Sequence, residues 1–444
     1  MGLLDRLFKT STEPKDQPNL SFGRYTDSYK EKSQYDAWDQ ALQAFEDEKY
    51  MDSYRAFFDY LRDPKLDNVQ FEESAEGQIT FEILQGSKKV MGYANEKHFK
   101  AEAKVALADE LHIGFMRRLI EQNFDLKYSR FALDKSDDIH IVFDTYTLDG
   151  SPYKLYYALK EVATKADKQD DLLIDEFDML YPTDTSHLVQ LPEAEKEAKY
   201  QFILEKIREV LEEVESGALD AHQYPGGIAY LLLDLCYKID YLTKPEGYLM
   251  EALERIHREY FAKDGRTTLQ KNHALRKEYQ KLIERPKEDF FKEMYTVVST
   301  FGITTPVNHD KVAAFIDGEL HNMDWYREQK YDRVALAVPG YIIGFCLFNY
   351  AVPPAIQDLF HLYFQITESA YFRKLGYTIP YVGASGTSLS SKEIKRALRT
   401  IEDKHHQAFP NMKIPTGSLQ YGNLVDFAKT FLLIVRNLDM TKAD

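Results

Sequence analysis

The N-terminal fold of this chain is decided by residues 78–107, QITFEILQGSKKVMGYANEKHFKAEAKVAL. Apolar and polar residues alternate over 79–83, which is the period of a half-buried strand. Residues 85–88 supply a Gly-containing turn, and residues 90–94 run back from it. A third alternating run covers 101–107. These patterns predict three consecutive strands of an antiparallel sheet.

The segment before the strands has a helical period. From residue 35 to residue 61 apolar residues recur at steps of three, four and seven, which predicts one amphipathic helix. Asp63-Pro64 ends it, because proline cannot continue a helix.

The segment after the strands alternates between helix and strand. Asp109 can cap a helix that ends near Asn123. The residues expected on its inner face are Leu111, Phe115, Leu119 and Ile120. Two further strands are predicted over 126–133 and 139–143, joined by a polar turn. Ser151-Pro152 then opens a last helix, since proline is favoured at the first helical position.

The predicted order is helix, three strands, helix, two strands, helix (α-β-β-β-α-β-β-α), with an antiparallel sheet covered by helices on one side. This order, with stretches such as GQITFEILQGSKKVMGYA, ADELHIGFMRRLIEQNF and DDIHIVFDTYTLDGSPYKLYYAL, resembles the type III secretion chaperone-like fold and the YbjN-like bacterial proteins that share it. The resemblance covers about residues 35–168. It implies a non-enzymatic role in which the domain binds an extended segment of another protein, often as a homodimer paired through the central helix and strands. Those proteins usually consist of this domain alone, whereas here more than half of the chain follows it.

The second half is predicted to be an all-α, multi-helical domain over residues 193–444. An acidic segment with two prolines, residues 169–192, is predicted to link it to the α+β domain. Amphipathic helices are expected at about 193–217, 225–242, 246–262, 270–284, 287–300, 309–324, 332–350, 353–370, 390–406 and 423–438. Residues 335–351 and 360–366 are apolar nearly all round and should form its centre. No fixed repeat length joins the helices, which argues against a tetratricopeptide-type array.

Residues 1–34 are interpreted as an amphipathic turn followed by a flexible linker. Leu3, Leu4, Leu7 and Phe8 recur at helical spacing ahead of the polar stretch TSTEPKDQPN. Through these four side chains the chain could touch a membrane surface, although such helices normally need more length or a second anchor. Docking on the protein itself or on a partner explains the same pattern.

Composition limits the classes of partner. The net charge of −16 would repel the phosphate backbone of nucleic acid. Cys236 and Cys346 both lie in apolar runs, where a free thiol behaves as a small buried hydrophobe. Unpaired cysteines fit a reducing compartment, so we expect a cytoplasmic protein. No run approaches the ~18 apolar residues of a membrane span.

A glycine-rich loop is the first candidate ligand site. Small residues ahead of a helix can gather backbone N–H groups around an anion. The residues concerned are Gly383, Ser385, Gly386, Thr387 and Ser388. The loop lacks the P-loop lysine pattern, and Ser390 with Glu393 forms an ordinary capping box that also explains the sequence.

A polar helix is the candidate metal site. Asp317 and His321 stand four residues apart, so they share one helix face with Glu319 and Asp324 nearby. A solvated helix surface produces the same pattern, and no second ligand pair has a recognisable spacing. We therefore expect no metal and no cofactor.

The cluster Trp325, Tyr326 and Arg327 is the candidate partner-binding site, because these residue types are enriched at binding hot spots. Packing within the helical domain is the competing interpretation. No catalytic residue is predicted: the Gly-x-Ser-x-Gly elbow is absent, and both cysteines sit in apolar surroundings that would raise their pKa.

The sequence thus favours a non-enzymatic protein-binding protein, chaperone-like or an adaptor, whose partner is another protein or a second copy. Two alternatives stay open. One is a small-ligand binder or enzyme with a pocket in the helical domain, and the other is a peripheral membrane scaffold that uses the N-terminal turn.

Overall fold

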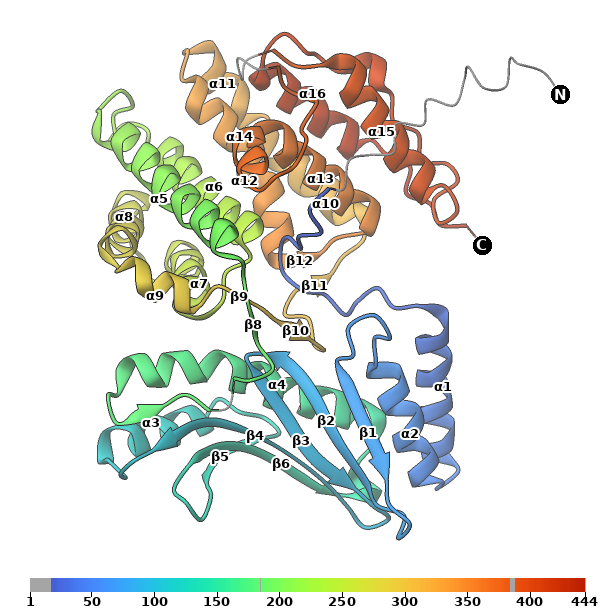
Figure 1. Cartoon of the computed structure of the whole chain (residues 1–444). Helices are drawn as coiled ribbons and strands as arrows, with labels where there is room; N and C mark the ends of the chain where they lie inside the picture. The colour runs from blue at the N-terminus through green and yellow to red at the C-terminus, as the bar shows by residue number, and fades with distance from the viewer. Residues whose placement is uncertain (1–16, 184, 384–387, 444) are drawn as a thin grey trace, which may run out of the picture.

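The computed structural model describes residues 17–183, 185–383 and 388–443. Buried hydrophobic side chains within these ranges form two clusters. One belongs to a sheet region, α1 to β7, and the other to a helical region, α5 to α16 (Figure 1). The expected α+β N-terminal part and largely helical C-terminal part are confirmed.

A helical hairpin opens the sheet region, formed by α1 (Lys32–Glu46) and α2 (Tyr50–Leu61). The single helix expected over 35–61 was therefore wrong. Glu48 adopts a left-handed backbone, with φ 60°, and reverses the chain. Neither glycine nor proline marks this turn, so the apolar period continues through it. On α2 the ring of Phe58 lies 4.8 Å from that of Phe81 in the sheet.

The sheet follows the order β1-β2-β3-β4-β6-β5, and all its neighbouring strands are antiparallel. Its strands are β1 (Val69–Glu73), β2 (Ile79–Gly86), β3 (Lys88–Ala94), β4 (His98–Ala108), β5 (Arg130–Leu133) and β6 (Ile139–Tyr146). The three strands and the later pair expected from the sequence are confirmed. Strand β1 was missed because it is a short edge strand that is mostly exposed and has no clear alternation.

The turn between β2 and β3 is held by a helix. Gln85 pairs with Lys88, so the loop has two residues, and Gly86 takes φ +55°, as such turns require. The Asp167 Oδ1 atom on α4 accepts a 2.7 Å hydrogen bond from the Ser87 N–H. A Cβ at Gly86 would lie 1.8 Å from that oxygen, so only glycine fits between turn and helix.

Helices α3 (Ile113–Asn123) and α4 (Pro152–Glu176) complete the sheet region. The N-cap of α3 is His112, which accepts from the Gly114 N–H, and not Asp109 as expected. Helix α4 packs with α2 on one face of the sheet and runs to Glu176, into the segment expected to be a linker. Strand β7 (Leu180–Tyr181) follows it and pairs with β4.

The helical region consists of helices joined by short loops. These are α5 (Glu193–Glu215), α6 (Pro225–Thr243), α7 (Gly247–Phe261), α8 (Thr268–Glu284), α9 (Lys287–Lys292), α10 (His309–Leu320), α11 (Asn322–Glu328), α12 (Asp332–Asn349), α13 (Pro354–Thr367), α14 (Ser369–Lys374), α15 (Ser391–His405) and α16 (Leu424–Arg436). The short strands are β8 (Val189–Gln190), β9 (Tyr295–Thr296), β10 (Val298–Ser299), β11 (Thr305–Pro306) and β12 (Tyr350–Ala351). The helix expected over 287–300 was wrong, because α9 ends at Lys292 and two strands follow. The region is therefore largely helical and not all-α.

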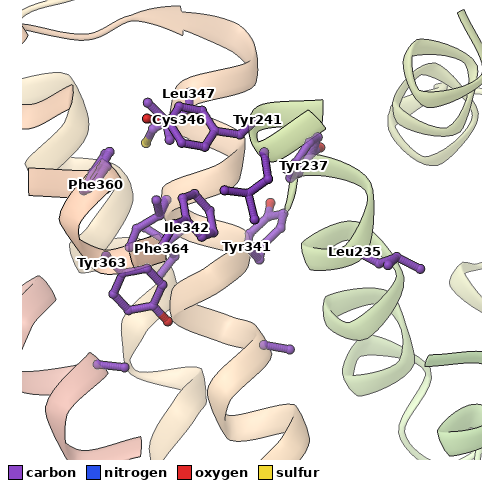
Figure 2. Close-up of a cluster of buried hydrophobic side chains, with 14 of the residues drawn as sticks. Leu235, Tyr237, Tyr241, Tyr341, Ile342, Cys346, Leu347, Phe360, Tyr363 and Phe364 are labelled. Atoms are coloured by element: carbon purple, nitrogen blue, oxygen red, sulfur yellow. The ribbon is translucent and has the colours of Figure 1, made fainter. Parts of the chain in front are cut away.

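The centre of the helical region is the contact between α6, α12 and α13. Figure 2 shows side chains of these helices in one buried cluster, among them Tyr237, Ile342 and Phe360. The prediction that 335–351 and 360–366 form the centre is confirmed. Cys236 and Cys346 are both free and buried here, as expected.

Segments of each region cross into the other. Residues 17–30, expected to belong to a flexible linker, lie against the helical region before the chain reaches α1 (Figure 1). In return β10 pairs with the end of β2, and the Gln85 side chain accepts hydrogen bonds from the backbone N–H groups of Thr300 and Phe301. The two regions are thus joined by main-chain and side-chain hydrogen bonds in both directions.

Candidate functional site

The most exposed apolar side chains of the described residues gather on and around α3. Phe124 is 93% exposed, Ile113 83% and Ile120 68%, and Leu111 and Tyr128 flank them. We call these five residues the α3 surface. Exposed apolar groups that cluster in this way are typical of interaction sites, whereas scattered ones need no explanation.

The α3 surface arises because α3 is apolar on two faces. Ile113, Ile120 and Phe124 are spaced by seven and four residues, which places them on one side of the helix. Phe115 and Leu119 occupy the other side and are buried in the sheet region. The expectation that Leu111 and Ile120 face inward was wrong: Leu111 precedes the helix, and Ile120 points to solvent. The signal was present in the sequence, since one helix cannot bury apolar residues all round unless it is covered on every side.

Charged residues border the α3 surface. The Arg117 guanidinium lies 2.9 Å from the Glu121 carboxylate one turn away, and Arg118 lies 3.8 Å from Glu176. Both pairs are exposed, so each contributes little to stability. Their value would lie in the orientation of a partner.

The loop beside α3 is rigidly held. The Glu161 carboxylate on α4 accepts hydrogen bonds from the backbone N–H groups of Lys127, Tyr128 and Ser129, at 2.9, 2.9 and 2.8 Å. Burial opposes ionisation of Glu161, but these hydrogen bonds lower its pKa overall. Tyr128 is therefore presented from an ordered loop and needs little ordering on binding.

The glycine-rich loop is described only at its ends. Gly383 donates its N–H to the Ser388 carbonyl at 2.9 Å, so these ends close on each other. Ser385, Gly386 and Thr387 lie outside the described residues, as do Leu3, Leu4, Leu7 and Phe8 of the predicted N-terminal turn. The anion-binding prediction stays untested.

The acidic helix does not assemble a metal site. Asp317 pairs with Arg436 at 2.8 Å, Asp324 with Lys429 at 2.5 Å, and Glu319 accepts from the Tyr230 hydroxyl at 2.6 Å. Each carboxylate thus contacts a different neighbour. In the ranges covered by the structure, no group of three His, Cys, Asp or Glu side chains could hold a metal ion.

The candidate partner-binding cluster is mostly packed. The Trp325 ring lies 4.9 Å from that of Tyr224, Tyr326 is half-buried beside Tyr230, and Arg327 pairs with Asp426 at 2.7 Å. These contacts favour packing over partner binding. The α3 surface, which sequence reasoning missed, is far more exposed.

A cavity of about 100 Å³ lies where the two regions meet. Its lining includes Asp167 of α4, the strap residue Arg24, and Lys244 and Glu246 between α6 and α7. Next to it are Asp170 and Asp171 of α4 and Glu293. Carboxylates therefore face one another across the junction.

The ionisation of these carboxylates is strongly shifted. Burial, together with Asp171 and Asp170, raises the pKa of Glu246 to about 8, although Lys244 opposes the shift. Burial, with Glu246 and Asp170 nearby, also raises the pKa of Asp167, although Lys88 and the Ser87 N–H oppose it. Protonated carboxyl groups are thus part of the folded junction.

We expect the free energy of unfolding to fall as pH rises from about 5 to 8.5. The folded pKa of Glu246 lies above its unfolded value of about 4.3, so its stabilising contribution is complete below that value and is lost as pH rises through 8. Glu246→Gln should reduce this loss. Urea unfolding at pH 5.5 and 8.5 checks it: the variant should exceed the wild type only at pH 8.5. An equal difference at both pH values would contradict the assignment.

A larger groove lies between α13 and α15. Its volume is about 720 Å³, within the range of small-molecule sites. His361 and Gln365 of α13 and Arg396 and Thr400 of α15 line it. Gly383 and Ser388 are not among the lining residues, and neither is the Asp317–Asp324 segment.

Comparisons with known proteins add no identity. No protein-family model, curated protein or solved structure matches this chain. Among the helices that the structure describes, none combines the length and apolar character needed to cross a membrane.

Proposed function

We propose that this chain is a non-enzymatic protein-binding protein and that the α3 surface is its contact site, with a second copy as the first partner. The observation that carries the proposal is the exposure of Ile113, Ile120 and Phe124 on one ordered helix face. Burying such side chains would contribute roughly 1.5 to 3 kcal/mol each. The resemblance of residues 35–168 to chaperone-like proteins implies the same kind of role.

The α3 surface suits pairing with itself. If two α3 helices pack antiparallel about an axis between Arg118 and Leu119, Ile113 of one copy meets Phe124 of the other. The same arrangement brings Arg117 of one copy beside Glu121 of the other, so opposite charges face each other. A symmetric dimer requires a surface that is complementary to itself, and α3 fulfils this in both shape and charge.

The arrangement of the two regions supports this choice. Helix α7 lies against α4, and β10 occupies the end of β2, so that side of the sheet region is engaged by the helical region. At the other edge, the outward N–H of Phe131 in β5 is bonded to the Asn123 side chain at 2.6 Å. Strand addition at this edge is thereby hindered, and the side chains of α3 are better placed to bind.

We expect Phe124→Asp to weaken self-association by roughly 30-fold or more, since a buried aromatic anchor contributes 2 kcal/mol or more. Sedimentation equilibrium from 1 to 100 µM measures the effect. Leu148→Asp is the matched control: Leu148 is 74% exposed but lies outside the α3 surface. A wild type that stays monomeric at 100 µM, or equal effects of both substitutions, would refute the proposed dimer.

The groove between α13 and α15 favours a second candidate function, small-ligand binding in the helical region. Neutral hydrogen-bonding side chains such as Gln365, Thr378 and Thr400 line it together with the apolar Leu362 and Ile401. A thermal-shift screen tests it, because a ligand at a hundred times its Kd should stabilise by about 2.7 kcal/mol. We also place the protein in the cytoplasm, on the basis of its free, buried cysteines. The membrane-scaffold alternative stays a hypothesis.

A further inference from the structure

We infer that Lys244 is a selectively reactive amine that forms imines with small neutral aldehydes in the cavity where the two regions meet. Lys244 lines this cavity together with Lys168. The two lysines share one cavity and differ in their partners, which provides an internal comparison. The inference is independent of the dimer proposed above.

The partners of the two amines are different in kind. The Lys168 ammonium lies 2.8 Å from Glu251 and 2.5 Å from Glu254, so two carboxylates hold it charged. Lys244 Nζ donates to the Ser21 hydroxyl at 3.2 Å, and no carboxylate of the described residues is within ion-pair distance of it. An amine without a paired carboxylate loses its proton more readily, and the neutral amine is the nucleophile.

The backbone fixes Lys244 in this place. It ends α6 in a left-handed conformation, with φ 46°, which is uncommon for a residue other than glycine. Such strain persists only where the surroundings determine it, and it is frequent at functional sites. Burial lowers the pKa of Lys244, Lys199 lowers it further, and Glu246 opposes the shift.

Glu246 supplies the acid that imine formation needs. It lines the same cavity two residues away, and its raised pKa keeps a protonated fraction at neutral pH. The Lys244 nitrogen attacks the carbonyl carbon, and the carbonyl oxygen takes up protons and leaves as water. The nitrogen loses its protons as the C=N bond forms, so aldehyde and amine give imine and one water. A cavity of about 100 Å³ admits an aldehyde of only a few carbon atoms, and the neighbouring carboxylates favour a neutral one.

Reductive alkylation of the whole protein tests the inference. The protein is treated with propanal and sodium cyanoborohydride between pH 6 and 10, and labelling of each lysine is followed by peptide mass spectrometry. At pH 7 we expect Lys244 to react roughly fivefold or more faster than Lys168 and than the exposed Lys392, because a desolvated amine is activated. Its rate should also reach half-maximum at a lower pH than theirs.

The same reaction in 8 M urea is the control, since unfolding should remove the difference between the three lysines. The inference is overturned if Lys244 reacts no faster than Lys392 in the folded protein, or if its advantage persists in urea. Glu246→Gln provides a second measurement: it should slow labelling of Lys244 and leave that of Lys392 unchanged. Equal rates at Lys244 with and without this substitution would remove Glu246 from the proposed step.

Discussion

Replacing Arg24 with alanine is expected to destabilise the protein by about 3 to 5 kcal/mol, the cost of breaking a buried ion pair. The guanidinium lies 2.8 Å from the Asp240 carboxylate and 3.3 Å from that of Glu254, and it stacks 3.6 Å from the Phe348 ring centre. Asp240 is only 3% exposed, and burial already raises its pKa in spite of Arg24. Without Arg24 its charge would be buried with no cation. The substitution would also release the segment 17–30 from α6.

Chemical denaturation of the wild type and the variant measures this effect. Arg117→Ala is the matched control, because its partner Glu121 is exposed and the pair should contribute about 0.5 kcal/mol or less. The double variant Arg24→Met/Asp240→Leu should recover part of the loss, since it removes both charges together. Equal stabilities of Arg24→Ala and Arg117→Ala would show that the pair does not hold the segment.

Gly344→Ala is expected to destabilise the protein by about 3 kcal/mol, the upper part of the usual range for overpacking. A Cβ at position 344 of α12 would lie 2.5 Å from the Tyr237 Cβ on α6. Both atoms are fixed to their backbones, so no rotamer change can relieve the clash and the two helices must move apart. Figure 2 shows Tyr237 and the neighbouring α12 residues Tyr341 and Ile342 in the cluster that such a shift would disturb.

Gly318→Ala is the matched control and should have the opposite sign. Gly318 lies inside α10, where a Cβ would meet nothing within 4 Å. Alanine there should stabilise by roughly 0.5 to 1 kcal/mol, because glycine loses more conformational freedom on folding. Thermal unfolding of both variants separates the effects. Stabilisation by Gly344→Ala as well would mean that α6 and α12 are not in close contact.

The candidate site could be predicted only in part. The sequence predicted the α3 helix and an interaction role, but it placed Ile120 inside and directed attention to Trp325, Tyr326 and Arg327, which pack within the helical region. An apolar residue has the same identity on either face of a helix. Which face is covered depends on the elements that pack against it, and these are distant in the sequence.

The sequence by itself determined the elements whose apolar residues follow a local period. Strands β2, β3, β4 and β6 and most helices of the second half were predicted because side-chain direction depends on the backbone of the same segment. The left-handed turn at Glu48 and the strands after α9 escaped, since no local signal marks them. Only the tertiary structure decided that Arg24 meets Asp240, that β10 joins β2, and that α3 stays uncovered. Such contacts depend on which distant surfaces are complementary, and a local period carries no information about a partner hundreds of residues away.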